Sequence, residues 1–492
     1  MASSTRNIRS NTNQASHWLV FFLACALLGL APILRGGNRQ IALVGLLLLS
    51  ALLLAVLLGS VSFDRLFGSA GKPAERRETR RAGMPLWSAL LLLFVASSPL
   101  WLGFLQLLPL SAGSWGGLAG RGLYFDALTA AGGSAPQELP LSLNPDATLT
   151  ALLSGIPALA TLLAALFLPR SLVEKCLVVL LVAGAFEMLL AVLQFWMGAR
   201  SPLYFGADSA TGFVGSFANR NHLADFLAML MPLWFYRLAE GTGGRAARAA
   251  AHHRGGAQFG GAGALWLFFG FALLVITLAT LSRGALLSAA LVLLPCTLLL
   301  IVKLKSKLSR KQQTLLAVAA AVFALLALAA VGAERVGQRL DTATVQLDAQ
   351  TRNNFTAATL DGARAFWPWG SGAGTFESVF PRFQAADSLF YIEYAHNDYA
   401  QLLMELGLPG LLLALAVAAL VVAQLVRLVR AYRAERRLSG ELALRAYCGL
   451  GALALLLHST VEFNMHIPAL ALTAAFLLGV YLRPLDAPRT KA

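Results

Sequence analysis

Four groups of polar residues remain once the basic loops between the apolar runs are set aside, and their residue types suit acid–base chemistry beside a phosphate. They fall at residues 219–222, 282–283, 396–398 and 458–466. An imidazole can take a proton from a sugar hydroxyl near neutral pH, and the forked donors of a guanidinium match phosphate oxygens. The candidate site residues are Asn219, Arg220, His222, Arg283, His396, Asn397, Asp398, His458 and Glu462.

Arg283 is the sharpest of these candidates because apolar segments flank it on both sides. A charged residue at the centre of a membrane helix costs about 2.5–3.5 kcal/mol, and less near the interface. Arg283 either extends to a lipid headgroup or binds a lipid-linked phosphate. Arg220 allows the same two interpretations, and together the two arginines could hold a pyrophosphate.

His396 is followed by Asn397 and Asp398, which can cap a helix that runs to Gly407. It is either the group that takes a hydroxyl proton or a structural histidine that holds its loop by hydrogen bonds. His222 and His458 are interpreted as structural. Glu462 either orients a histidine or binds sugar hydroxyls, or it only caps the last helical turn.

The composition predicts an integral membrane protein. Of 492 residues, 58% are hydrophobic and 13% are charged, whereas soluble proteins carry about 25% charged residues. The net charge of +15 does not indicate nucleic-acid binding, because the basic residues cluster in short loops between apolar runs. The four cysteines lie far apart within apolar runs, so neither a disulfide framework nor a metal site is predicted.

Apolar runs close to the length that crosses a bilayer predict an all-α fold with about twelve transmembrane helices and both termini on one side. With the amino terminus inside, the basic clusters fall in interior loops and no lysine falls outside, as the positive-inside rule requires. This orientation puts all four polar groups on the outer side. The predicted spans are 17–34, 40–62, 84–110, 147–168, 172–197, 222–238, 264–281, 284–302, 313–332, 408–427, 444–461 and 466–482.

Residues 333–407 form a long polar interval that ends at the His396 group. A structureless loop of this length is uncommon in a compact protein, and the interval is too rich in aromatic residues to be disordered. We expect a small folded cap outside the membrane. Its segment 370–374 resembles a phosphate-binding loop only loosely, and a turn that brings backbone close to the membrane is the favoured interpretation. A polar exterior loop is also expected at 111–146.

At these residues the chain resembles the O-antigen ligase superfamily, which includes lipopolysaccharide O-antigen ligases, Wzy-type polymerases and bacterial protein O-oligosaccharyltransferases. The similarity covers roughly residues 139–482 of a single polytopic membrane domain, 1–492. The pieces that carry it are GSFANRNH at 215–222, LSRGA at 281–285, PWGSGAGTF at 368–376, AHNDY at 395–399, ELG at 405–407, HS at 458–459 and FN at 463–464.

The resemblance implies a GT-C-type glycosyltransferase of the bacterial inner membrane that uses no cofactor and no metal. It would transfer a glycan from undecaprenyl pyrophosphate to an acceptor hydroxyl at the periplasmic face, with cytoplasmic termini. Carried onto this chain, Arg220 and Arg283 would bind the donor pyrophosphate. His396 would activate or position the acceptor hydroxyl, and the other candidate residues would support it.

The acceptor is left open by the sequence. A ligase uses a lipid A core, an O-antigen or exopolysaccharide polymerase uses another lipid-linked glycan, and a protein transferase uses a serine or threonine. A ligase-like activity is favoured. Membrane lipid is an expected partner, and nucleic acid is not. A transporter of the same lipid-linked glycan is the alternative of a different class. Transporters tend to show repeats and ionisable groups at the bilayer midplane. Here the ionisable residues of the four polar groups fall at one membrane–water interface, which favours an enzyme.

Overall fold

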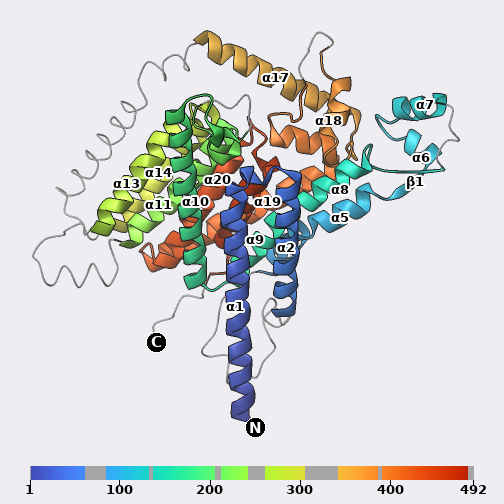
Figure 1. The fold of residues 1–492 in the computed structure, drawn as a ribbon. Helices are drawn as coiled ribbons and strands as arrows, with labels where there is room; N and C mark the ends of the chain where they lie inside the picture. Colours follow the sequence, from blue (N-terminus) through green and yellow to red (C-terminus); the bar gives the residue numbers. More distant parts are fainter. Residues whose placement is uncertain are drawn as a thin grey trace, which may run out of the picture.

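The computed structural model describes residues 2–60, 85–131, 137–205, 212–241, 261–304, 342–385 and 391–485. Within these ranges the fold is helical, as predicted, and the sole sheet is a pair of three-residue antiparallel strands, β1 and β2. The long helices run side by side as a bundle, and α17 lies across one end of it (Figure 1). The α-helices and strands are α1 (Ala2–Ile33), α2 (Gln40–Ser60), α4 (Leu86–Ala96), α5 (Ser98–Gln106), β1 (Pro109–Ser111), α6 (Ala112–Gly116), α7 (Gly122–Ala130), β2 (Glu138–Pro140), α8 (Pro145–Ser154), α9 (Ile156–Phe167), α10 (Arg170–Met197), α11 (Arg220–Gly241), α13 (Gly261–Ala279), α14 (Arg283–Leu304), α17 (Thr342–Ala365), α18 (Phe376–Val379), α19 (Asp398–Glu435), α20 (Gly440–His458) and α21 (Pro468–Leu482).

Each predicted span overlaps a helix except 313–332, which lies outside the described residues. Among the described residues, seven helices are long and apolar enough to cross a membrane, or eight if the bent pair α4–α5 is one span. The expectation of about twelve spans is therefore supported only in this coarser form. The segment 84–110 is not one straight helix, because α4 and α5 meet at an angle of 54° next to Pro99.

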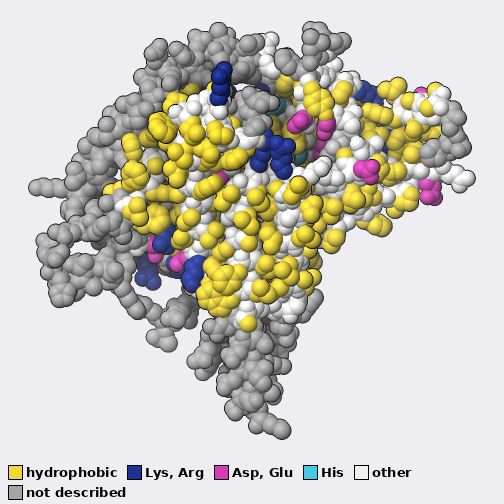
Figure 2. Space-filling model, viewed as in Figure 1, with side chains coloured by type: hydrophobic (Ala, Val, Ile, Leu, Met, Phe, Trp, Pro, Cys, Tyr) yellow, Lys and Arg dark blue, Asp and Glu magenta, His cyan; other side chains and the backbone are white. Residues whose placement is uncertain are grey.

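The core of the bundle is built from α1, α2, α9, α10, α11, α13, α14, α20 and α21. Small residues let these helices approach closely: a methyl group added at Gly451 would lie 2.8 Å from the Met229 carbonyl oxygen, and one at Gly479 would lie 2.6 Å from that of Leu162. Close packing at small residues is typical of helices in lipid. Hydrophobic side chains cover most of the described surface in Figure 2, as expected for a protein that faces lipid.

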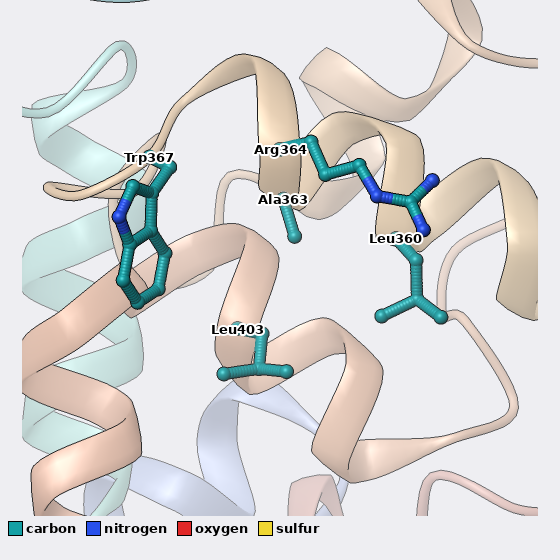
Figure 3. A pocket seen from close by; sticks show the side chains of 5 residues that line it. All are labelled: Leu360, Ala363, Arg364, Trp367 and Leu403. Atoms are coloured by element: carbon teal, nitrogen blue, oxygen red, sulfur yellow. The ribbon is translucent and has the colours of Figure 1, made fainter.

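The described part of the interval 333–407 is folded, and we call its residues 342–385 and 391–397 the cap. The cap has a small core of its own, in which Phe366, Phe376 and Phe380 are fully buried against Met404 of α19. An open apolar pocket of about 430 Å³ lies between the end of α17 and α19 (Figure 3). Its lining residues are Leu360, Ala363, Arg364, Trp367 and Leu403.

The expected loop 111–146 also contains structure. Strand β1 pairs with β2, and α6 and α7 lie between them. Arg121 is fully buried and donates hydrogen bonds to the carbonyl oxygens of Leu141 and Gly370, which ties this segment to the cap. Burial lowers the pKa of Arg121 to about 10, so its guanidinium remains charged at neutral pH.

Candidate active site

His396 is held at the junction between the cap and α19. Its φ of 50° is left-handed, a conformation that a non-glycine residue adopts only where its surroundings fix it. On one side, the Ala395 N–H donates to Oε1 of Gln401 at 3.0 Å. On the other side, Asn397 is the N-cap of α19 and accepts from the N–H groups of Tyr399 and Ala400. The predicted cap of this helix is therefore confirmed, and it fixes the backbone of the candidate base.

Glu462 lies at the centre of the site, in the turn between α20 and α21, and its side chain is fully buried. Its Oε2 is 3.1 Å from Nδ1 of His396. Its Oε1 accepts from Nδ2 of Asn221 at 2.6 Å and from Nη2 of Arg352 at 2.9 Å. One carboxylate thus joins α11, α17, the segment that precedes α19 and the turn after α20. Of the roles considered for Glu462, the structure supports the orientation of a histidine.

The charge of Glu462 determines which nitrogen of His396 carries the proton. Burial alone would raise the pKa of this carboxyl, but the hydrogen bond from His396 and the positive charges of His396 and Arg352 outweigh it and lower the pKa to about 2. Glu462 is therefore ionised at neutral pH and can only accept hydrogen bonds. Nδ1 of His396 must then be the protonated nitrogen, which leaves Nε2 of the neutral ring as a base.

Aromatic rings surround His396. Its ring meets Phe463 edge-on with the centroids 4.9 Å apart, and it stacks more loosely on Phe355 at 6.5 Å. Tyr394 stacks on Phe463 with the ring centroids 4.5 Å apart, and His222 contacts Phe463 edge-on at 4.9 Å. His222 is buried and packs on Phe463 within this group of aromatic rings.

Asp398 is directed toward a second histidine, His466, rather than toward His396. Its Oδ1 is 2.8 Å from Nδ1 of His466, and its Oδ2 accepts from the N–H of Met465 at 2.9 Å. Burial would lower the pKa of His466, but the hydrogen bond to Asp398 outweighs it and the pKa is raised. Asp398 therefore fastens the start of α19 to the turn that carries Glu462.

His458 is the last residue of α20, four positions before Glu462. Its Nδ1 is 3.3 Å from Oδ1 of Asp225 on α11, and both side chains are buried; the pair is close enough for an ionic contact but lacks the geometry of a hydrogen bond. A methyl group added at Gly284 would lie 2.7 Å from the His458 ring and 2.9 Å from Val461. The first turn of α14 is thus packed directly against the residues that precede Glu462.

Arg220 and Arg283 occupy equivalent places, as the first residues of α11 and α14, and both are half-buried. Arg220 is adjacent to Asn221, which contacts Glu462, and Asn219 accepts from the Asn221 N–H at 2.8 Å. Arg283 is adjacent to Gly284, which packs against His458 and Val461. The structure therefore brings both helix starts to the turn that carries Glu462. Helix amino termini carry partial positive charge, which favours an anion nearby.

The glycine-rich segment 370–374 is not available as a phosphate loop. Its backbone donors are used within the protein: the N–H groups of Gly374 and Phe376 donate to the Glu405 carboxylate, and that of Ala373 donates to Gln106. Gly370, at a φ of 76°, lies against the backbone of Glu405. The segment is a tight turn that docks the cap on α19, as favoured from the sequence.

Sequence reasoning missed Arg352, Gln401 and Glu405 as parts of this network. Arg352 lies on α17, which no apolar run marks, and a lone arginine in a polar interval looks like a surface residue. Gln401 and Glu405 stand four residues apart on α19 and are joined by a hydrogen bond of 3.2 Å. This spacing on one helix face was a usable signal.

The fold and the site together define a polytopic helical membrane protein with a histidine–carboxylate pair at one end of its helix bundle. Residues 268–415 match the family model Wzy_C, described as O-Antigen ligase, and this match supports the resemblance of the chain to the O-antigen ligase superfamily. The matched segment includes Arg283, Arg352 and His396. No curated protein matches the chain.

Proposed function

We propose that the protein is a membrane glycosyltransferase that transfers a glycan from undecaprenyl pyrophosphate to an acceptor hydroxyl at the periplasmic face. The observation that carries this proposal is the hydrogen bond between His396 and the buried Glu462, at the point where the starts of α11 and α14 meet. The pair supplies a base, and the helix starts supply positive charge. The O-antigen ligase match supports a lipid-linked glycan as the substrate.

In the proposed reaction, Nε2 of His396 takes the proton of the acceptor hydroxyl while the hydroxyl oxygen bonds to the anomeric carbon of the donor glycan. The bond from that carbon to the diphosphate oxygen breaks, and its electron pair leaves with undecaprenyl pyrophosphate. Arg220 and Arg283 hold the diphosphate and offset its charge. The imidazolium of His396, stabilised by Glu462, then releases its proton to water.

The length of α19 supports a periplasmic site. This helix begins beside His396 and is interrupted at Gly407; at 1.5 Å per residue, its part after Gly407 is about 42 Å long, more than the roughly 30 Å of bilayer hydrocarbon. Its far end carries Arg427, Arg430 and Arg433. Because basic clusters favour the cytoplasm, His396 is assigned to the opposite side.

The proposal is tested with purified protein, an undecaprenyl-pyrophosphate glycan and an acceptor. Wild-type protein is expected to release undecaprenyl pyrophosphate together with glycan transfer, whereas a transporter moves the lipid without cleaving it. His396→Ala and Arg283→Ala are each expected to lower transfer by at least about a hundredfold, the usual contribution of a proton-transfer group or charge-stabilising donor.

Two matched variants serve as controls for this assay. His17→Ala removes a histidine of α1 whose ring packs on Phe167, and Arg364→Ala removes an exposed arginine of α17. Both are expected to keep near-normal transfer. Near-normal transfer by either site variant, at wild-type accumulation in the membrane, would contradict the assigned roles.

The ligase, polymerase and protein-transferase readings share this donor chemistry and differ in the acceptor. Deletion in the source bacterium separates them through its surface glycans. Accumulation of lipid-linked polymer without attachment indicates a ligase, which we favour. Loss of glycan chain length indicates a polymerase, and loss of glycosylated serine or threonine indicates a protein transferase.

A further inference from the structure

Arg352 connects the cap to the candidate active site through two contacts. Its Nη2 donates to Oε1 of Glu462 at 2.9 Å, and its Nη1 donates to the carbonyl oxygen of Val461. Its side chain is 33% exposed, whereas that of Glu462 is not exposed at all. Arg352 is therefore the cation that the cap delivers to the carboxylate holding His396.

The position of Glu462 creates an electrostatic conflict for a histidine that must act as a base. A buried carboxylate beside an imidazole stabilises the imidazolium, which has no lone pair to accept a proton. Oε1 of Glu462 is shared by Arg352 and Asn221, and only Oε2 faces His396. A positive charge on the far oxygen offsets the carboxylate charge and fixes the plane of the carboxyl group.

We propose that Arg352 is a positioning residue that acts on His396 through Glu462. It keeps Oε2 of Glu462 aimed at Nδ1 of His396, so that Nε2 is the ring nitrogen left to accept the proton of the hydroxyl. This inference rests on the proposed function of His396. It also makes docking of α17 a condition for activity, because the cation comes from the cap and the carboxylate from the turn after α20.

Other titratable and charged groups lie on the elements packed against this network and could also affect the pH profile. Because they are the same in every variant, the effect of Arg352 is taken from the difference between the profiles of the variants and that of wild type. These groups are Arg220, His222 and Asp225 of α11, Arg283 of α14, Asp398 of α19, His458 of α20, and His466.

The test compares the transfer rate across pH for wild-type protein, Arg352→Gln, Arg352→Lys and the control Arg364→Gln. Arg364 lies on the same helix, paired with Asp361 on the surface, and its guanidinium points away from Trp367 (Figure 3). Arg352→Gln is expected to lower kcat by about ten- to a hundredfold, the cost of a slightly misplaced catalytic group. The acid limb of its rate–pH profile is expected to move to higher pH, because the charge of Glu462 is no longer offset by Arg352.

The lysine variant separates charge from geometry and carries the test if Arg352→Gln does not accumulate. Lysine keeps the charge but cannot donate to Glu462 and Val461 as a fork, so we expect a wild-type acid limb and a partial loss of kcat. The KM for the donor is expected to stay within about threefold of wild type in all four proteins, because Arg352 acts through Glu462. Arg364→Gln is expected to match wild type.

The kcat of a double variant distinguishes a positioning role of Arg352 from a purely structural one. If Arg352 works through Glu462, then adding Arg352→Gln to Glu462→Gln causes little further loss of kcat, because residues that act as a unit are not additive. Independent losses that multiply would overturn the proposal. So would a wild-type kcat and acid limb in Arg352→Gln, or a raised donor KM with unchanged kcat, which would make Arg352 a donor-binding residue.

The parallel His396→Ala measurement distinguishes the two proposals. If His396→Ala keeps its activity, the proposed function fails and the role of Arg352 fails with it. If His396→Ala is inactive while Arg352→Gln behaves as wild type, only the assignment of Arg352 is overturned.

Discussion

At the residue scale, the site depends on a single carboxyl group that makes all of its contacts inside the protein. Glu462 receives hydrogen bonds from His396, Asn221 and Arg352, and these come from three separate segments. Removing one partner from such a buried group costs more than the contact itself contributes, because the remaining charge is left without compensation. We therefore expect Glu462 to influence stability as well as activity.

The stability contributed by Glu462 should depend on pH with a definite sign. Its pKa falls from an ordinary 4.5 to about 2 in the folded protein. A depressed carboxyl pKa stabilises the fold above the unfolded value, and this stability is lost as the pH falls toward the folded value. The melting temperature of wild-type protein should exceed that of Glu462→Gln by a constant amount above about pH 5, and the gap should shrink between about pH 4.5 and 2.

The control for this measurement is Glu377→Gln, at an exposed position of α18. Its melting temperature should differ less from wild type at every pH, because an exposed carboxyl makes little net contribution. A gap between wild type and Glu462→Gln that widens on acidification would contradict the assigned ionisation of Glu462.

Residue types and spacing were enough to nominate His396 and Glu462, but not to pair them. They are 66 positions apart, and only the folded arrangement of the α20–α21 turn shows that the carboxylate orients the imidazole. Arg352 was missed for the same reason, because its partner is 110 positions away and its own neighbours in sequence are ordinary polar residues. A contact between distant segments leaves no periodic signal along the chain.

At the element scale, α19 links the site to the rest of the bundle. Asn397 caps its start, and the helix is interrupted at Gly407, where φ is 56° and ψ is −134°. The N–H of Leu408 donates to the carbonyl oxygen of Pro368 at 2.7 Å across this break. The kink therefore provides the surface on which the glycine-rich turn of the cap is seated.

Replacement of Gly407 by alanine should loosen the cap. The added methyl group would lie 2.2 Å from the Pro368 carbonyl oxygen, and the backbone conformation is one that alanine avoids. We expect Gly407→Ala to cost about 1–3 kcal/mol of unfolding free energy and to speed proteolysis of the cap. Gly45→Ala is the control, because Gly45 lies on α2 with open space around it; an equal loss of melting temperature in both variants would contradict the argument.

The helices of the bundle were largely predictable because a helix that crosses a bilayer needs about twenty consecutive apolar residues. The two elements whose shape differed show the limit of that rule. The helix of span 408–427 begins at Asp398, ten residues earlier, because Asn397 caps it and a glycine lets the helix continue through a bend. The segment 84–110 is broken at α4–α5 by a bend that hydropathy does not report.

At the scale of the whole molecule, the cap and the basic end of α19 lie on opposite ends of the bundle. Figure 2 shows basic, acidic and histidine side chains near one another toward the upper end of the molecule, beyond a broad hydrophobic surface. This separation supports the proposed orientation, in which the site lies at one face of the bilayer and the basic loops lie at the other.

Single-cysteine labelling tests this orientation. A cysteine at Tyr391, an exposed cap position, should react with a membrane-impermeant maleimide on intact spheroplasts, and one at Arg433 should react only after lysis. Cys176, Cys296 and Cys448 are buried and Cys25 is half-buried, so the background should be low, and a variant without them serves as the control. The reverse pattern would place His396 in the cytoplasm and overturn the proposed function.

The order of the site residues along the chain has a consequence for the synthesis of the protein. Asn221, Arg352 and His396 leave the ribosome well before Glu462, which lies in the connection to the last described helix. Under the proposed function, a nascent chain therefore carries its base and much of the described cap before it carries the carboxylate that orients the base. Under the same proposal, activity begins only when the α20–α21 hairpin has been inserted, so polypeptides that stall before it cannot act on the lipid-linked donor.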